Sequence, residues 1–202
     1  MKGFEFNFRR AVQALGYIQE KTSITDKLSL IKLLFFADRY HLRAFCISML
    51  EDTYIALRKG PVCSCTLDLI NRSNYYFQLT QDEQVYVSKN VVTSGWNVAI
   101  SERNTDLLSK SAIMALNFAI DNFSKFDPYD LVEIAHSYPE WKRFEDFLKK
   151  NPKNSKDMSY VDFFDNPKSD DFAIQEYFTG KDPFAMDEKF LTASKQEFLK
   201  LA

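Results

Sequence analysis

Two pairs of residues have the spacing that places a carboxylate beside an imidazole on one face of a helix. They are Asp38 with His41, and Glu133 with His136. Residues three positions apart are neighbours on a helix surface, and paired Glu-x-x-His units ligate di-iron centres in four-helix bundles. Such a centre also needs a carboxylate from each of two further helices, and the other helical segments offer carboxylates only near their ends or beside polar neighbours. We therefore expect no metal or other cofactor, and a carboxylate–histidine metalloenzyme is the less favoured alternative.

Asp38 raises a second question because it lies inside LSLIKLLFFADRYHLRAF (28–45), the most apolar run of the chain. A helical projection places Asp38 on the apolar side of this run. The cations of the run lie on the opposite side: Lys32, Arg39 and Arg43. An unpaired buried carboxylate costs several kcal/mol or stays protonated, so Asp38 needs a hydrogen-bonding partner. We expect it to hold the turn around 59–61, or a neighbouring turn, and a catalytic acid is the alternative.

The cysteines give no catalytic or metal-binding signature. Cys46, Cys63 and Cys65 are odd in number and form no CxxC pair, and the chain has only two histidines. A structural zinc site is therefore not expected, and we interpret the cysteines as reduced thiols of a cytoplasmic protein. The sequence contains neither Gly-x-Ser-x-Gly nor a glycine-rich phosphate loop. A Cys63–His136 nucleophile–base pair stays open, because proximity in the fold cannot be read from the sequence. The favoured expectation is that the protein is not an enzyme.

The elements that must position these residues are mostly helices, because apolar residues recur with a helical spacing. The clearest helix start is FDPYDLVEIAH, in which Asp127 is the cap and Pro128 occupies the first helical position. A short extended stretch, 53–57, precedes Gly60-Pro61, which we expect to continue neither a helix nor a strand ladder. The predicted helices span about residues 7–20, 26–43, 64–73, 106–123, 128–136 and 139–148.

Residues 75–100 have a different character. The segments YYFQL, QVYVSK and WNVAI are rich in β-branched and aromatic residues, and TQDE offers a turn between the first two. These features predict a small antiparallel hairpin or wing. The predicted fold class is therefore α+β, predominantly α-helical, with one helical domain that carries a small antiparallel β-hairpin.

The chain divides by composition near residue 150. We predict a domain over 1–150 and an aromatic-rich C-terminal extension over 151–202, behind the polar linker KKNPKNSK. The extension carries 9 of the 31 aromatic residues, and a disordered tail seldom keeps that many. We expect the extension to dock on the domain, and a partner-binding helix is the alternative.

Charge and hydropathy limit the partners. The formal net charge is −2, which gives no global electrostatic case for nucleic acid. Helices followed by a hairpin are nevertheless compatible with a winged-helix-like DNA-binding regulator. Such a regulator would use a local basic patch formed by Arg9, Arg10, Arg39, Arg43, Arg58 and Lys59. The apolar runs are too short and too charged to span a membrane, and the N-terminal residues lack the apolar region of a signal peptide, so we expect no membrane association.

Three motifs, taken in order, carry a family resemblance. KLLFFADRYH (32–41), DTYIALRKGPV (52–62) and DLVEIAHSYPEW (130–141) resemble the landmarks of the Panacea domain family, which includes SocA-like antitoxins. The resemblance covers about residues 8–148. The family commonly has Tyr before Gly-Pro and Pro after Val, and here those positions hold Lys59 and Cys63.

The resemblance implies an antitoxin of a toxin–antitoxin system that neutralises a cognate toxin from a neighbouring gene by binding it. SocA-like members are also linked to delivery of the toxin to the ClpXP protease, as proteolytic adaptors, and the family occurs in mobile genetic elements. The motif positions carried over to this chain are expected to be structural rather than toxin contacts. They are Asp38, Tyr40, Tyr54, Gly60, Pro61, His136 and Trp141.

Overall fold

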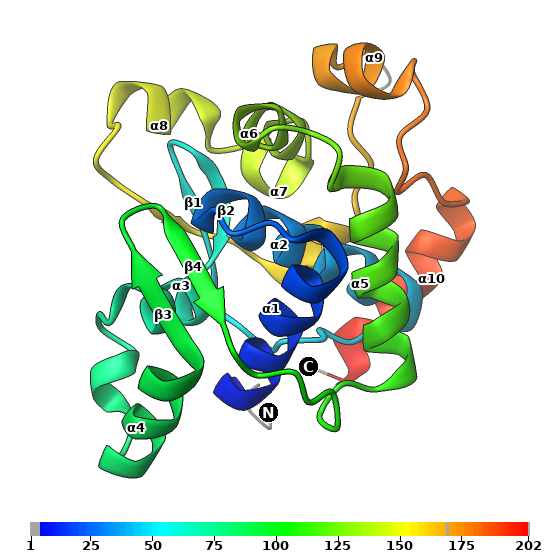
Figure 1. Ribbon diagram of the computed structural model, residues 1–202. Coiled ribbons are helices and arrows are strands. Elements are labelled where there is room, and N and C mark those ends of the chain that lie inside the picture. Colours follow the sequence, from blue (N-terminus) through cyan, green and yellow to red (C-terminus); the bar gives the residue numbers. More distant parts are fainter. Residues whose placement is uncertain (1–4, 169, 202) are drawn as a thin grey trace.

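The computed structural model describes residues 5–168 and 170–201, and helix α2 (Lys27–Phe45) runs through the middle of the molecule (Figure 1). Asp26 caps this helix, because its side chain accepts a hydrogen bond from the Ser29 amide at 2.8 Å. Fourteen of its 19 residues are buried. A helix that is buried on every side must be covered by other elements all round. The cations on the side opposite Asp38 are therefore buried as well: Lys32, Arg39 and Arg43.

Helices from the N-terminal part and from the middle of the chain cover α2. As Figure 1 shows, α1 (Phe8–Thr22), α5 (Lys110–Phe123) and α6 (Pro128–His136) lie around it. The start of α6 confirms the predicted cap, because the Asp127 carboxylate accepts from the next two free amides of the helix. Shorter helices complete this part of the chain: α3 (Ser64–Asn71), α7 (Pro139–Lys142) and α8 (Glu145–Lys150).

A three-stranded antiparallel sheet packs beside α2. Its strands are β1 (Tyr54–Leu57), β2 (Gly60–Cys63) and β5 (Lys156–Asp157), in the order β2-β1-β5. The prediction that Gly60-Pro61 ends the extended region is wrong, since both residues begin β2. Pro61 lies opposite Ala56 on an edge strand, where a missing N–H is tolerated. The small sheets and many helices confirm a predominantly helical α+β fold.

An antiparallel hairpin lies within 75–100, as predicted, but only its second strand coincides with a predicted segment, WNVAI. It consists of β3 (Val91–Ser94) and β4 (Asn97–Ile100). The two preceding strands were wrongly predicted, because that region forms the 3₁₀ helix η1 (Tyr76–Gln78) and helix α4 (Gln81–Asn90). Thr80 and Glu83 form a reciprocal capping box at the start of α4, which favours a helix over the expected TQDE turn.

The C-terminal residues share the core of the preceding chain. After β5 come the 3₁₀ helix η2 (Tyr160–Phe164), α9 (Phe172–Phe178) and α10 (Glu188–Leu201). Phe163, Phe184 and Phe198 are buried in the same cluster as the apolar residues of α2. The division into a domain and an extension near residue 150 stays a prediction. In the part of the chain described, no helix is long and apolar enough to cross a membrane.

Candidate functional site

Asp38 is buried and connects three segments of the chain. Its carboxylate accepts hydrogen bonds from the Ser48 hydroxyl at 2.7 Å, from the Tyr54 hydroxyl at 2.7 Å and from the Met49 amide. Burial raises the pKa of the Asp38 carboxyl, and the hydrogen bonds oppose that shift. The expected contact with the turn around Gly60 is absent from these hydrogen bonds, and the neighbouring turn after α2 takes its place. This arrangement supports an anchoring role for Asp38.

Lys32 holds the β1–β2 turn that had been expected to bind Asp38. Its ammonium lies in the core and donates to the Pro61 carbonyl at 2.8 Å. Gly60 makes room for this contact, since a Cβ atom there would lie 2.6 Å from Lys32 Nζ, and its φ of +89° is one that other residues rarely adopt. Burial lowers the pKa of Lys32 to about 7.

His136 and Trp141 lie beside the same turn. Their rings stack with centroids 3.5 Å apart and planes 10° apart, and Trp141 Nε1 donates to the Leu57 carbonyl at 2.8 Å. Burial, followed by the charge of Lys32, lowers the pKa of His136 to about 3, so the imidazole is neutral at physiological pH. Its Nε2 atom is buried without a hydrogen-bond partner. These contacts make His136 a stacking partner of the tryptophan.

The residues of the metalloenzyme alternative do not gather into one metal-binding group in the described part of the chain. His41 is engaged on both ring nitrogens, with the Ile47 carbonyl at 2.8 Å and the Ser111 hydroxyl at 3.0 Å. Glu133 lies apart from it, beside His136 in a surface hollow. Within the described ranges, no group of three or more His, Cys, Asp and Glu residues could hold a metal ion. Burial raises the pKa of the Cys63 thiol well above its usual value, which keeps that thiol protonated.

Arg39 is a buried cation rather than part of a basic surface. Its guanidinium pairs with Glu140 at 2.6 Å, and neither side chain has exposed surface. It also donates to the Phe163 and Asp165 carbonyls, each at 3.0 Å. Burial raises the pKa of Glu140 while Arg39 lowers it. The predicted six-residue basic patch therefore loses Arg39, because the C-terminal segment covers this side of α2.

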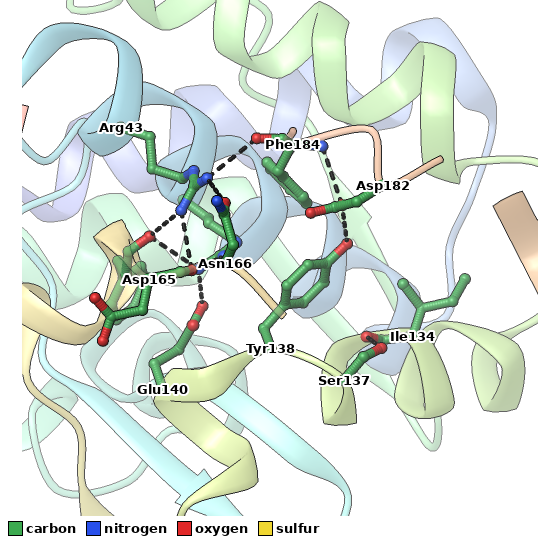
Figure 2. A network of polar contacts seen from close by, with 11 residues as sticks. Arg43, Ile134, Ser137, Tyr138, Glu140, Asp165, Asn166, Asp182 and Phe184 are labelled. Carbon is green, nitrogen blue, oxygen red and sulfur yellow. Dashed lines mark hydrogen bonds and ion pairs between the residues drawn. The ribbon is translucent and has the colours of Figure 1, made fainter. Parts of the chain in front are cut away.

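Arg43, one helical turn further along α2, binds the same segment. Figure 2 shows its guanidinium donating to the backbone carbonyls of Asp165 and Phe184, at 3.1 and 3.2 Å, and to the Asn166 side chain at 2.6 Å. A further bond reaches the Phe163 carbonyl at 2.9 Å. Burial lowers the pKa of Arg43 to about 9. The second buried arginine also falls outside the predicted patch.

An exposed face lies at the tips of the β1–β2 and β3–β4 hairpins. Lys59 lies in the β1–β2 turn. Its ammonium is 5.3 Å from the ring centroid of Trp96, which lies in the β3–β4 turn. It is 5.7 Å from the ring centroid of Tyr129, which lies in the first turn of α6. Trp96 is 68% exposed and Tyr129 is 67% exposed. With Lys27 and Arg58, these residues form what we call the hairpin-tip face. Neither aromatic residue was predicted to be functional, although an aromatic residue directly after Gly95 in a hairpin turn was a usable signal.

Two hollows flank Lys59. The larger, about 650 Å³, lies between the β1–β2 turn and helices α6 and α8. Its polar lining includes Arg58, Lys59, Glu133, His136, Glu145 and Lys149. The smaller hollow, about 220 Å³, is mostly apolar. Its lining includes Leu28, Ile31, Leu57, Val62, Leu67 and Trp96. The face therefore offers cations, exposed aromatic rings and an apolar recess side by side.

The family motifs gather around these contacts. Asp38 and Tyr54 are hydrogen-bonded to each other, whereas Gly60 and Pro61 lie with His136 and Trp141 beside Lys32. Tyr40 stands apart and stacks on Phe118 with ring centroids 4.1 Å apart.

Comparison with known families identifies the chain. Residues 30–142, more than half of the chain, match the family described as antitoxin SocA-like, Panacea domain. The protein therefore belongs to this family, which confirms the resemblance seen in the three motifs. No match was found among curated proteins or among solved structures.

Proposed function

We propose that this protein is an antitoxin that neutralises a cognate toxin by binding it directly. The observation that carries the proposal is the match of residues 30–142 to the SocA-like antitoxin family. The hairpin-tip face supports a binding mechanism, because it exposes two aromatic rings beside Lys59.

Two finer statements extend this proposal. The first is that the partner is encoded by a neighbouring gene, as part of a toxin–antitoxin system on a mobile element, and that the pair acts in the cytoplasm. The three free cysteines are compatible with a reducing compartment. The second is that the protein is also a proteolytic adaptor, which delivers bound toxin to a ClpXP-type protease.

The test of the proposal is co-expression with the neighbouring gene. We expect expression of that gene alone to arrest growth, and expression of this protein to restore growth and to co-purify with the gene product. For the adaptor role, the half-life of the toxin should shorten in cells that contain the protease and stay long in cells that lack it. A neighbouring gene that is harmless when expressed alone would count against the proposal.

The metalloenzyme alternative has its own test. Metal analysis of the purified protein should give no stoichiometric iron, manganese or zinc. A bound metal that is lost in His136→Ala would instead support the carboxylate–histidine enzyme.

A further inference from the structure

We propose that the hairpin-tip face binds the toxin through a short acidic segment that carries an apolar side chain. This inference rests on the proposed antitoxin function and names the surface and the chemistry of the contact. The acidic group would lie against the cations of the face, and the apolar side chain would enter the recess beside Trp96.

The charge of the face argues for an acidic partner. Lys27, Arg58 and Lys59 form no ion pair with any carboxylate of the described chain. The polar contact of the Lys27 ammonium is with a neutral group, the Asn71 side-chain oxygen, at 2.7 Å. Complementary charges at an interface speed encounter and select the correct partner. Three cations without an internal counter-ion therefore present a site for a carboxylate.

The aromatic rings supply anchoring area. Trp96 and Tyr129 are large side chains that stay about two-thirds exposed on either side of Lys59. Trp, Tyr and Arg are the residues most enriched among those that dominate binding energy at interfaces. A partner that covers this face would exclude water from both rings and from the cation–π contacts that join them to Lys59.

The smaller, apolar hollow indicates that the partner inserts a side chain into the face rather than packing flat against it. Its lining combines Trp96 with leucines of three elements, and Lys59 also lines it. Its volume of about 220 Å³ suits one large apolar side chain. An acidic residue near that side chain could then reach Lys59.

The face is held in place before any partner binds. The Lys27 amide donates to the Trp96 carbonyl at 2.9 Å, and the Val98 amide donates to the Thr25 carbonyl at 2.7 Å, so the start of α2 fixes the β3–β4 hairpin. The Lys32 contact with Pro61 fixes the β1–β2 turn in the same way. A preorganised surface loses less conformational entropy on binding, which favours tight association.

A protein segment fits this face better than a nucleic acid does. Glu133 and Glu145 line the larger hollow beside Arg58 and Lys59. A continuous phosphate backbone that crossed the face would approach these carboxylates, whereas a short acidic segment could contact the cations alone. We therefore propose a protein partner, and the test below includes DNA binding as a result that would contradict this choice.

The test measures binding of the purified neighbouring-gene product to the full-length protein and to two variants of the face. Lys59→Glu reverses the central charge, and Trp96→Ala removes the anchor. The matched controls are Lys181→Glu, at an exposed lysine of the C-terminal segment, and Phe172→Ala, at a ring that is 70% exposed on α9. We expect each face variant to weaken binding by about tenfold or more, with an unchanged melting temperature, and the controls to stay within about twofold of the wild type.

Each result decides between specific alternatives. If the wild type binds the toxin and protects cells, and both face variants bind with the same affinity, the proposed surface is wrong and the antitoxin function still holds. A wild-type protein that neither binds nor protects would overturn both. A dimer that becomes monomeric in Trp96→Ala would assign the face to a second copy of the chain. Salt-sensitive binding of the protein's own promoter DNA that is lost in Lys59→Glu, while toxin binding persists, would assign the face to nucleic acid.

Discussion

Four ionisable side chains of α2 bind the backbone of segments outside the helix. Lys32 donates to the Pro61 carbonyl, Asp38 accepts from the Met49 amide, and Arg39 and Arg43 donate to carbonyls of the C-terminal segment. Buried polar groups of this kind are tolerated when they are paired. Contacts to the backbone do not depend on the side chains of the partner segment. The central helix can therefore hold loops of different sequence in the same position.

Replacing Asp38 by Ala should destabilise the protein. The change removes the acceptor of three buried donors, and each donor left without a partner costs about 1–3 kcal/mol, so we expect a loss of about 3 kcal/mol or more in the free energy of unfolding. Urea denaturation measures this loss, and Tyr54→Phe, which removes one donor, should lose about 1 kcal/mol. An Asp38→Ala protein with wild-type stability and no activity would favour the catalytic interpretation.

Lys32 should make stability depend on pH in the alkaline range. Its pKa is about 7 in the fold and 10.5 in the unfolded chain, so between these values the unfolded state binds a proton that the native state does not. The contribution of Lys32 to the free energy of unfolding should therefore rise with pH in this interval, by up to about 1.4 kcal/mol per pH unit.

The comparison of wild type with Lys32→Met isolates this effect. Denaturant titrations from about pH 7.5 to 9 stay below the range in which most tyrosines and lysines of the unfolded chain titrate. The buried Cys63 and half-buried Cys65 thiols keep their protons in the fold and lose them in the unfolded chain in this range, which opposes the rise in both proteins. The slope of the free energy of unfolding against pH should therefore be more positive in the wild type than in the variant. Equal slopes in the two proteins would contradict a buried amine with a lowered pKa.

At the scale of elements, the β1–β2 turn depends on Gly60. An alanine there must adopt a φ of +89° and place its Cβ 2.6 Å from Lys32 Nζ, so we expect Gly60→Ala to cost about 2 kcal/mol or more. Gly95→Ala is the matched control in the other hairpin, because its φ is +59° and nothing lies within 4 Å of the added atom. Thermal denaturation should show a clearly larger loss for Gly60→Ala, and equal losses would mean that the contact with Lys32 is not restrictive.

The elements also show what the sequence could predict. Local signals placed α6 correctly, because the Asp127-Pro128 cap is a property of adjacent residues. The T-x-x-E pattern before α4 was an equally local signal, but the β-branched and aromatic residues of QVYVSK led to the wrong prediction of a strand. Strand propensity depends on packing context, whereas a capping box acts directly on the helix end.

The burial of Arg39 and Arg43 could not be predicted from neighbouring residues in the sequence. A helical projection assigns cations opposite an apolar stripe to solvent, and this rule fails when a distant segment covers that side. Here the covering segment lies more than 100 residues further along the chain. The partners of Asp38 were missed for a related reason, since a buried carboxylate predicts that donors exist but not which turn supplies them.

At the scale of the whole molecule, the C-terminal segment contributes to the core around α2. Phe184 packs on Phe36 and Phe123, and Phe163 packs on Phe35 and Tyr54. The same segment supplies the carbonyls that pair with the two buried arginines. Loss of the segment would expose apolar surface, leave Arg43 without these carbonyl acceptors and leave Arg39 with Glu140 alone.

Truncation after Lys150 should therefore prevent stable folding. We expect the 1–150 fragment to aggregate or to melt without a cooperative transition, because it lacks the buried aromatic residues of the C-terminal segment and the carbonyls that accept from Arg39 and Arg43. A second truncation that removes only α10 should be milder. Size-exclusion chromatography and circular dichroism measure both. A monomeric 1–150 fragment that melts cooperatively near the temperature of the full chain would instead support an independent domain followed by an extension.

The most direct test of the account is the titration of the purified protein into the purified, active product of the neighbouring gene. Neutralisation by direct binding predicts that toxin activity falls in proportion to the protein added and disappears at a fixed stoichiometry, with no protease present. Lys59→Glu should require a much higher concentration for the same effect, whereas Lys181→Glu should match the wild type. Toxin activity that persists in the presence of excess wild-type protein would contradict the central claim.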